Sequence, residues 1–336
     1  MLNANAHKNF TASGNREAEA LLEKVLCEIK QTLSGTALCV YLGGSYGRGD
    51  GGVRQDRENG ILYNDLDFFV FAENKQNGAE QLLKEISERY EKELKVDVDF
   101  SRTMSVRDIK NNAKRLMMQE LKRGYRLVSG KDLLAEYLPE YPAEQLPFSE
   151  ACRLFLNRGM GLLLAWEKLN NNSTDTDFIL RNINKAILGA CDAFLIAEHK
   201  YKWQIAERHN EINNSDLSAD CKKLYAQAVE FKQSPNRDII HDLKQLWLSA
   251  CDVFHECMES SCGKDIYLKC CEESELSLKH FIKYCIKSRT LPLKIWQRYT
   301  MPTVAVLANE VYQALADKPT EKISKSKLYQ HWLIFN

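Results

Sequence analysis

The sequence lacks a surplus of charge of either sign, and it lacks any repeat or low-complexity stretch. Of its 336 residues, 46 are Lys or Arg and 46 are Asp or Glu, so the formal net charge is zero. A neutral chain is not expected to bind nucleic acid through bulk charge, although a local basic groove stays open. The charged fraction of 27% and the hydrophobic fraction of 44% are ordinary for a globular protein, which argues against disorder, collagen and coiled coil.

Long apolar segments are also missing. No apolar run approaches the ~20 residues that span a bilayer, and the longest candidates, such as Gly161–Trp166, are short. The first fifteen residues are polar and contain no apolar h-region, so no secretory signal is expected. Eleven cysteines without a tight pairing pattern fit reduced thiols. We therefore expect a cytoplasmic protein with no membrane partner.

The length predicts about two domains. Residues 137–149 hold three of the seven prolines, and proline ends helices and removes hydrogen-bond donors, so this segment is the expected linker. The predicted domains are therefore residues 1–136 and 150–336.

The first domain alternates helical and strand-like patterns. The predicted strands are residues 37–42, 65–71 and 96–100. The predicted helices are residues 17–33, residues 78–94, and a helix capped by Ser105 that runs to about residue 122. This order is typical of an α/β domain built on a small mixed sheet.

The second domain has a helical period throughout. Its predicted helices are residues 149–169, 177–201, 220–233, 237–260, 272–287 and 304–316. The expected fold class is thus α+β, with an N-terminal α/β domain on a small mixed sheet followed by an all-α helical-bundle domain.

The most informative segment is LGGSYGRGDGG, residues 42–52. It follows a predicted strand, so its glycines let backbone N–H groups approach an anion closely, and Ser45 adds a hydroxyl donor. A literal G-x-G-x-x-G occurs at residues 47–52, but no amphipathic helix follows it, as a dinucleotide fold would require. The segment therefore predicts a phosphate-binding turn of another kind.

Two acidic pairs follow this turn. Asp65 and Asp67 are two residues apart, which on a strand puts both carboxylates on one face, and Asp97 and Asp99 repeat the pattern on the next predicted strand. Neighbouring strands lie about 4.8 Å apart, so carboxylates from both strands can meet at one point. Clustered carboxylates repel unless cations neutralise them, and oxygen ligands favour Mg²⁺ or Mn²⁺. An Asp-x-Asp pair alone would be equally consistent with solvent-facing strand residues.

Taken in order, L-G-G-S at residues 42–45, D-L-D at residues 65–67 and V-D-V at residues 96–98 form one constellation. It resembles the motif of the DNA polymerase β-like nucleotidyltransferase superfamily, and the resemblance covers roughly residues 35–105. The string VDVDFSR is similar to the poly(A)-polymerase-type strand, in which the acid precedes Phe by three residues and Arg by five. That register selects Asp97 as the third acid and keeps Asp99 as the alternative.

The resemblance implies roles for these residues. Gly44 and Ser45 would hold the nucleotide phosphates, Asp65 and Asp67 would bind two metal ions, and the third acid would bind the catalytic ion and help to deprotonate the acceptor. The implied cofactor is Mg²⁺ or Mn²⁺, and the implied substrate is a nucleoside triphosphate, with ATP expected.

One loop departs from minimal members of the superfamily in length and in charge. The loop at residues 46–64 is longer and rich in charge, which makes it a candidate for contact with the acceptor. Basic residues are candidates for contact with the triphosphate, namely Arg48 and Arg102 and, on a predicted helix of the second domain, Lys185. A solvated helix face is the alternative explanation for Lys185 and for Arg181, which lies four residues before it.

The expected activity is transfer of a nucleoside monophosphate, AMP from ATP, to an acceptor hydroxyl with release of pyrophosphate. The acceptor would be a small antibiotic-like molecule or a protein hydroxyl. A synthase of second-messenger oligonucleotides is an alternative, and so is a non-catalytic nucleotide-binding sensor or scaffold with the same fold. RNA 3′-end addition is disfavoured because no basic surplus is present.

One further group of residues was weighed as a zinc site. Its members are Cys251, His255, Cys257, Cys262, Cys270 and Cys271. Only Cys257 and Cys262 come close to the spacing of zinc ligands, so buried or free thiols are the favoured interpretation.

Overall fold

The computed structural model describes residues 9–54, 60–73, 79–235, 242–263, 266, 269, 303–319 and 322–335. Two compact units divide the chain. The first is Met1–Pro142 with Glu230–Ile239, and the second is Ala143–Val229 with Ile240–Asn336. A small mixed sheet and many helices make up the described residues, so the expected α+β class is confirmed.

The sheet of the first unit has the order β3–β2–β1–β5, and β4 also pairs with β2. The strands are β1 (Cys39–Leu42), β2 (Leu66–Ala72), β3 (Val98–Phe100), β4 (Met104–Ser105) and β5 (Arg126–Ser129). Strand β1 runs antiparallel to β2 and β5, whereas β2 runs parallel to β3 and β4. The sequence predicted β1, β2 and β3. It missed β4 and β5, because these strands are short and bury too few side chains to give a pattern.

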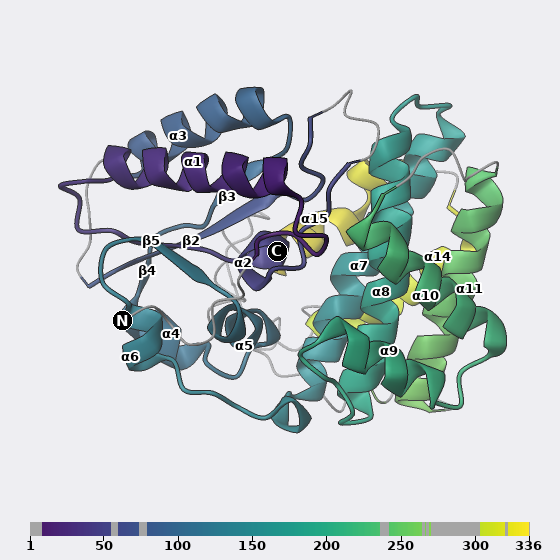
Figure 1. Ribbon diagram of the computed structural model, residues 1–336. Coiled ribbons are helices and arrows are strands. Elements are labelled where there is room, and N and C mark those ends of the chain that lie inside the picture. The colour runs from purple at the N-terminus through teal and green to yellow at the C-terminus, as the bar shows by residue number, and fades with distance from the viewer. Residues whose placement is uncertain are drawn as a thin grey trace, which may run out of the picture. The chain divides into compact units, whose positions relative to one another are not determined.

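Helices cover both faces of this sheet (Figure 1). Helices α1 (Arg16–Thr32) and α3 (Ala79–Leu94) lie on one face, and α4 (Val106–Asn111), α5 (Leu116–Arg123) and α6 (Leu133–Tyr137) lie on the other. Along β2, Leu66, Phe68 and Val70 pack in the core with α1 and α3. Phe69 and Phe71 pack in the core with α4, α5 and α6. Strand β2 is therefore apolar on both faces except at Asp67.

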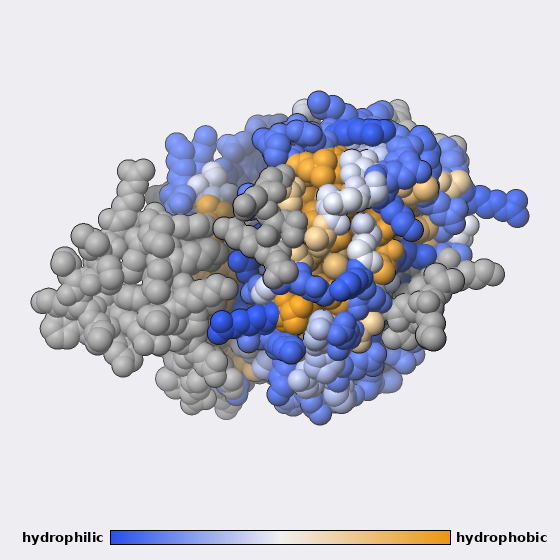
Figure 2. All heavy atoms as spheres, turned by 90° about the vertical axis from the view of Figure 1, so that its left-hand side faces the viewer, coloured by the Kyte–Doolittle hydropathy of each residue, from blue (hydrophilic) through white to orange (hydrophobic). Residues whose placement is uncertain are grey.

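The space-filling view agrees with this layering. Figure 2 shows a band of apolar residues between hydrophilic surfaces, as expected where the sheet layer lies between the polar outer faces of helices.

The helix expected from Ser105 to about residue 122 is wrong in its length. Ser105 does cap α4, with a reciprocal pair of hydrogen bonds to Asp108. The helix then ends at Asn111, and α5 begins only at Leu116. The side chain of Asn112 donates to the carbonyl of Asp108 at 2.8 Å, which competes with the helical hydrogen bonds and ends α4.

The second unit is helical in its described part. Its helices are α7 (Phe148–Asn170), α8 (Thr176–Ala197), α9 (Ile205–Asn213), α10 (Ala219–Gln233, of which the residues from Glu230 onward belong to the first unit), α11 (Leu243–Cys262), α14 (Val304–Asp317) and α15 (Lys327–Phe335). The sequence predicted α7, α8, α10, α11 and α14 and missed the shorter α9 and α15. The predicted helix at residues 272–287 lies outside the described residues.

Helix α7 packs against α8, α11 and α14. Trp166 of α7 stacks on Trp247 of α11, with 4.2 Å between the ring centroids. The indole N–H of Trp247 donates to the carbonyl of Leu162 at 2.8 Å, so this large side chain is buried with its polar atom satisfied. Within the described part of the chain, no helix combines the length and the apolar character that crossing a bilayer requires.

Candidate active site

The glycine-rich segment after β1 forms a short helix, α2 (Gly44–Arg48), with Gly43 at its N-cap position. The N–H of Gly43 donates to the carbonyl of Asp67 at 2.8 Å, which ties the start of α2 to β2. The first N–H groups of a helix have no acceptor within that helix. The backbone at Gly44 and Ser45 is therefore at the donor end of α2, where an anion is favoured.

Two glycines of this turn are needed for close approach. Gly44 has φ of +59°, and a side-chain carbon there would overlap Oδ2 of Asp67. A side-chain carbon at Gly43 would come within 3 Å of both Phe69 and Leu121. The carboxylate of Asp67 thus lies directly against the backbone of α2.

The acidic residues lie on two neighbouring strands. Asp67 of β2 and Asp99 of β3 are direct partners in the parallel register. The N–H of Leu66 donates to the carbonyl of Asp97 at 2.9 Å, so Asp97 lies beside the start of β2. Leu66 and its partner on β3 are buried on the opposite face. By strand alternation, the four carboxylates of Asp65, Asp67, Asp97 and Asp99 share one face of the sheet.

These carboxylates differ in exposure. Asp65 and Asp67 are half-buried, whereas Asp97 and Asp99 on the edge strand are exposed. The register brings Asp99, rather than Asp97, directly opposite Asp67. The sequence favoured Asp97 as the third acid, and the strand pairing gives its alternative, Asp99, the closer relation to Asp67.

A buried tyrosine connects α2 to the start of β2. The hydroxyl of Tyr46 donates to the carbonyl of Gly52 at 2.8 Å and accepts from the N–H groups of Tyr63 at 3.0 Å and Asn64 at 3.3 Å. Burial raises the pKa of Tyr46, so the hydroxyl keeps its proton. The side-chain oxygen of Asn64 in turn accepts from the N–H of Gly52 at 2.7 Å. These bonds fix the residue that directly precedes Asp65.

The predicted acceptor loop at residues 46–64 is largely packed in its described part. Ile61, Leu62 and Tyr63 are buried. Arg54 is also buried, and its Nε donates to the carbonyl of Leu62 at 3.1 Å. Residues 55–59, which hold three more charges of the loop, lie outside the described residues.

Arg48, a predicted nucleotide contact, is held between two carboxylates. Its Nε lies 3.5 Å from Oδ2 of Asp50, and its Nη1 lies 3.4 Å from Oε2 of Glu120 on α5. The side chain is only 19% exposed. A nucleotide phosphate would therefore compete with two ion pairs for this guanidinium.

The remaining predicted basic contacts lie apart from this turn in the chain. Arg102 follows β3 and is exposed. Lys185 and Arg181 are half-buried on α8 in the second unit. Contact of Arg102 and of Lys185 with a triphosphate stays a prediction.

Sequence reasoning missed Tyr46 and Asn64, which position the acidic strand, and Glu120, which holds Arg48. No spacing signal marks them, because their partners are distant in sequence. The hydroxyl of Tyr46 meets the N–H of a residue 18 positions away, and Glu120 lies 72 positions from Arg48.

Among the described residues, the members of the cysteine and histidine group weighed as a zinc site do not form a cluster with one another. His255 lies with its Nε2 3.1 Å from the carbonyl oxygen of Tyr312. Cys257 instead meets Cys191, with 3.8 Å between the two Sγ atoms. Cys270 and Cys271 lie outside the described residues.

No protein-family model matches this chain, and no curated protein matches it either. A functional assignment therefore depends on the geometry of the site.

Proposed function

We propose that the first unit is a nucleotidyltransferase of the DNA polymerase β-like type. It would transfer a nucleoside monophosphate, AMP from ATP in the first instance, to an acceptor hydroxyl. One observation carries the proposal. The carboxylate of Asp67 lies against the backbone of Gly44 and pairs in register with Asp99 on the neighbouring strand. The glycine-rich turn and the two acidic strands thus meet at one residue.

The donor set fits a hard divalent cation. Asp67 and Asp99 are register partners, and by strand alternation Asp65 and Asp97 are expected on the same side of the sheet. Oxygen ligands of this kind are those that Mg²⁺ and Mn²⁺ prefer. When bound, such ions would neutralise the triphosphate and favour ionisation of the acceptor hydroxyl.

The residues of the chain would bind the phosphates and accept the proton of the acceptor. The N–H groups at the start of α2 and the hydroxyl of Ser45 would bind phosphate oxygens. These donors lie where β1 ends and α2 begins, and the N-terminus of a helix favours an anion. The exposed carboxylate of Asp99 would accept the proton of the acceptor hydroxyl. The acceptor oxygen then bonds to the α-phosphorus, and the bond from that phosphorus to the departing pyrophosphate breaks.

The neutral chain favours a small molecule or a protein hydroxyl as acceptor over a long nucleic acid. A small acceptor would reach the exposed Asp97 and Asp99 from the edge of the sheet. The acceptor class is open to direct test with labelled nucleotide.

The test is incubation of the full chain with each α-labelled nucleoside triphosphate and Mg²⁺, first alone and then with a cell extract. Asp67→Asn should lower pyrophosphate release by at least about 100-fold. The matched control is Glu88→Gln, which changes an exposed carboxylate on α3 and should leave the rate unchanged. Nucleotide binding without any transfer by the unaltered chain would contradict catalysis and favour a nucleotide sensor.

A further inference from the structure

Three buried thiols meet in the second unit. They are Cys191 on α8, Cys221 on α10 and Cys257 on α11. The Sγ atom of Cys191 lies 3.9 Å from that of Cys221 and 3.8 Å from that of Cys257. All three Sγ atoms lie within 4.8 Å of one another, and none of the three residues is more than 1% exposed. We call these residues the thiol cluster.

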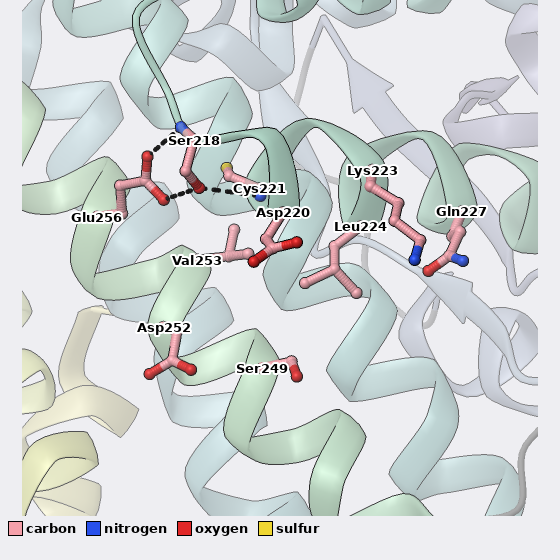
Figure 3. Close-up of a pocket in the computed structure, with 10 residues that line it drawn as sticks. All are labelled: Ser218, Asp220, Cys221, Lys223, Leu224, Gln227, Ser249, Asp252, Val253 and Glu256. Carbon is pink, nitrogen blue, oxygen red and sulfur yellow. Dashed lines mark hydrogen bonds between the residues drawn. The ribbon is translucent and has the colours of Figure 1, made fainter.

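Hydrogen bonds that involve no thiol sulfur join two of the three helices of the thiol cluster, α10 and α11. The N–H and the hydroxyl of Ser218, at the start of α10, both donate to the carboxylate of Glu256 on α11. The N–H of Cys221 donates to the hydroxyl of Ser218 at 3.1 Å (Figure 3). Glu256 directly precedes Cys257, so the contact that joins the two helices also brings two members of the thiol cluster together.

The size of the thiol cluster matches metal coordination. With two edges of 3.8 and 3.9 Å and a third no longer than 4.8 Å, a point equidistant from the three sulfurs lies about 2.2 to 2.5 Å from each. Zinc–thiolate bonds are about 2.3 Å long. A single ion at that point would therefore need little movement of the helices.

Apolar packing alone does not explain why the three cysteines lie together. Buried cysteine usually behaves as a small apolar side chain, and the buried Cys152 and Cys251 join no such group within the described part of the chain. Hydrogen bonds within the thiol cluster lower the pKa of Cys221, whereas burial raises the pKa values of Cys191 and Cys257.

We propose that Cys191, Cys221 and Cys257 form a binding site for one thiophilic d¹⁰ metal ion, Cu(I) or Zn²⁺. Sulfur ligands select these ions over Mg²⁺ and Ca²⁺. Each sulfur–metal bond forms as the thiol gives up its proton to solvent, so binding strengthens as the pH rises. Three thiolates suffice for Cu(I), whereas Zn²⁺ would complete a tetrahedron with a further ligand such as water.

A pocket lies next to one member of the thiol cluster. Its volume is about 390 Å³, and Cys221 belongs to its lining. Three carboxylates line it between α10 and α11, those of Asp220, Asp252 and Glu256, against the single ammonium of Lys223 (Figure 3). This excess of negative charge favours a cation in front of Cys221.

The experiment uses the full chain, reduced and stripped of metal under anaerobic conditions. It is titrated with Cu(I) and, separately, with Zn²⁺, each against a chromophoric chelator of known affinity. We expect one equivalent of one of these ions per chain, and the comparison of the two titrations identifies which. Cys191→Ala, Cys221→Ala and Cys257→Ala should each weaken binding by at least about tenfold.

The matched control is Cys251→Ala, because Cys251 is also buried on α11 but lies outside the thiol cluster. It should bind the ion like the unaltered chain. A second readout needs no variant: the bound ion should give thiolate-to-metal charge-transfer absorption and raise the melting temperature of the unaltered chain. The proposal is overturned if the unaltered chain binds neither ion stoichiometrically, or if Cys251→Ala and Cys257→Ala weaken binding equally.

Discussion

The carboxylate of Asp67 lies against the backbone of Gly44, in a position that any side chain at residue 44 would occupy. This contact joins α2, which follows the first strand, to the acidic strand β2. It also limits the possible substitutions at the site, because a side chain at residue 44 would require Asp67 to move.

Gly44→Ala should therefore abolish nucleotidyl transfer. The added carbon overlaps Asp67, and a left-handed backbone costs about 1–3 kcal/mol for a residue other than glycine. Gly35→Ala is the matched control, since Gly35 also has a positive φ, +87°, but has no atom within 4 Å of the added carbon. Both variants should unfold at lower urea concentrations, and only Gly44→Ala should stop pyrophosphate release. Equal activity in the two variants would show that the contact with Asp67 is not needed.

The strand register ranks the two candidates for the third acid. Asp99→Asn should lower transfer by about 100-fold or more, because Asp99 pairs directly with Asp67. Asp97→Asn should have a smaller effect, since Asp97 lies beside the start of β2. Rates at saturating nucleotide decide between them. A larger loss in Asp97→Asn would restore the assignment that the sequence favoured.

Tyr46→Phe tests the connection between α2 and the acidic strand. Removing the hydroxyl leaves the N–H groups of Tyr63 and Asn64 without this acceptor, which should cost about 1–3 kcal/mol of stability. Tyr41→Phe is the control, because the hydroxyl of Tyr41 is equally buried and bonds to backbone groups near α6. Urea unfolding should show similar losses of stability. Transfer activity should fall only in Tyr46→Phe, and a parallel fall in both variants would mean a general effect of stability.

The second unit should lose stability in mild acid through His331 on α15. Burial lowers the pKa of His331 from its usual value of 6.5, and Lys327 adds to this shift. The unfolded chain therefore takes up the proton more readily, so this contribution to stability is present above about pH 6.5 and is lost as the pH falls. The melting temperature should drop less steeply below that pH in His331→Gln. His199→Gln, at an exposed histidine, should keep the steep drop of the unaltered chain.

The predictable parts of this protein are those in which a periodic pattern and a buried face coincide. Strand β3 follows from alternation, and helices α1 and α3 follow from apolar spacing in the sequence. The four aspartates also follow, because an i, i+2 pair on a strand needs no knowledge of the neighbours. Strand β5 could not be predicted, since among its four residues only Val128 is buried.

Contacts between distant residues could not be predicted either. Cys191 and Cys257 are 66 positions apart, and only the packing of α8 on α11 brings them together. Sequence spacing directed attention instead to the cysteines near Cys257 along the chain. The choice between Asp97 and Asp99 depended in the same way on a strand register that no local pattern encodes.

Strand β2 is bonded on both edges, to β1 on one side and to β3 and β4 on the other. Its backbone amides should thus be among the slowest in the first unit to exchange hydrogen with solvent. The proposed reaction would then take place on a segment that stays ordered while the periphery of the unit opens and closes. The arriving nucleotide would meet carboxylates already fixed in space, so little of its binding energy would be spent on ordering them.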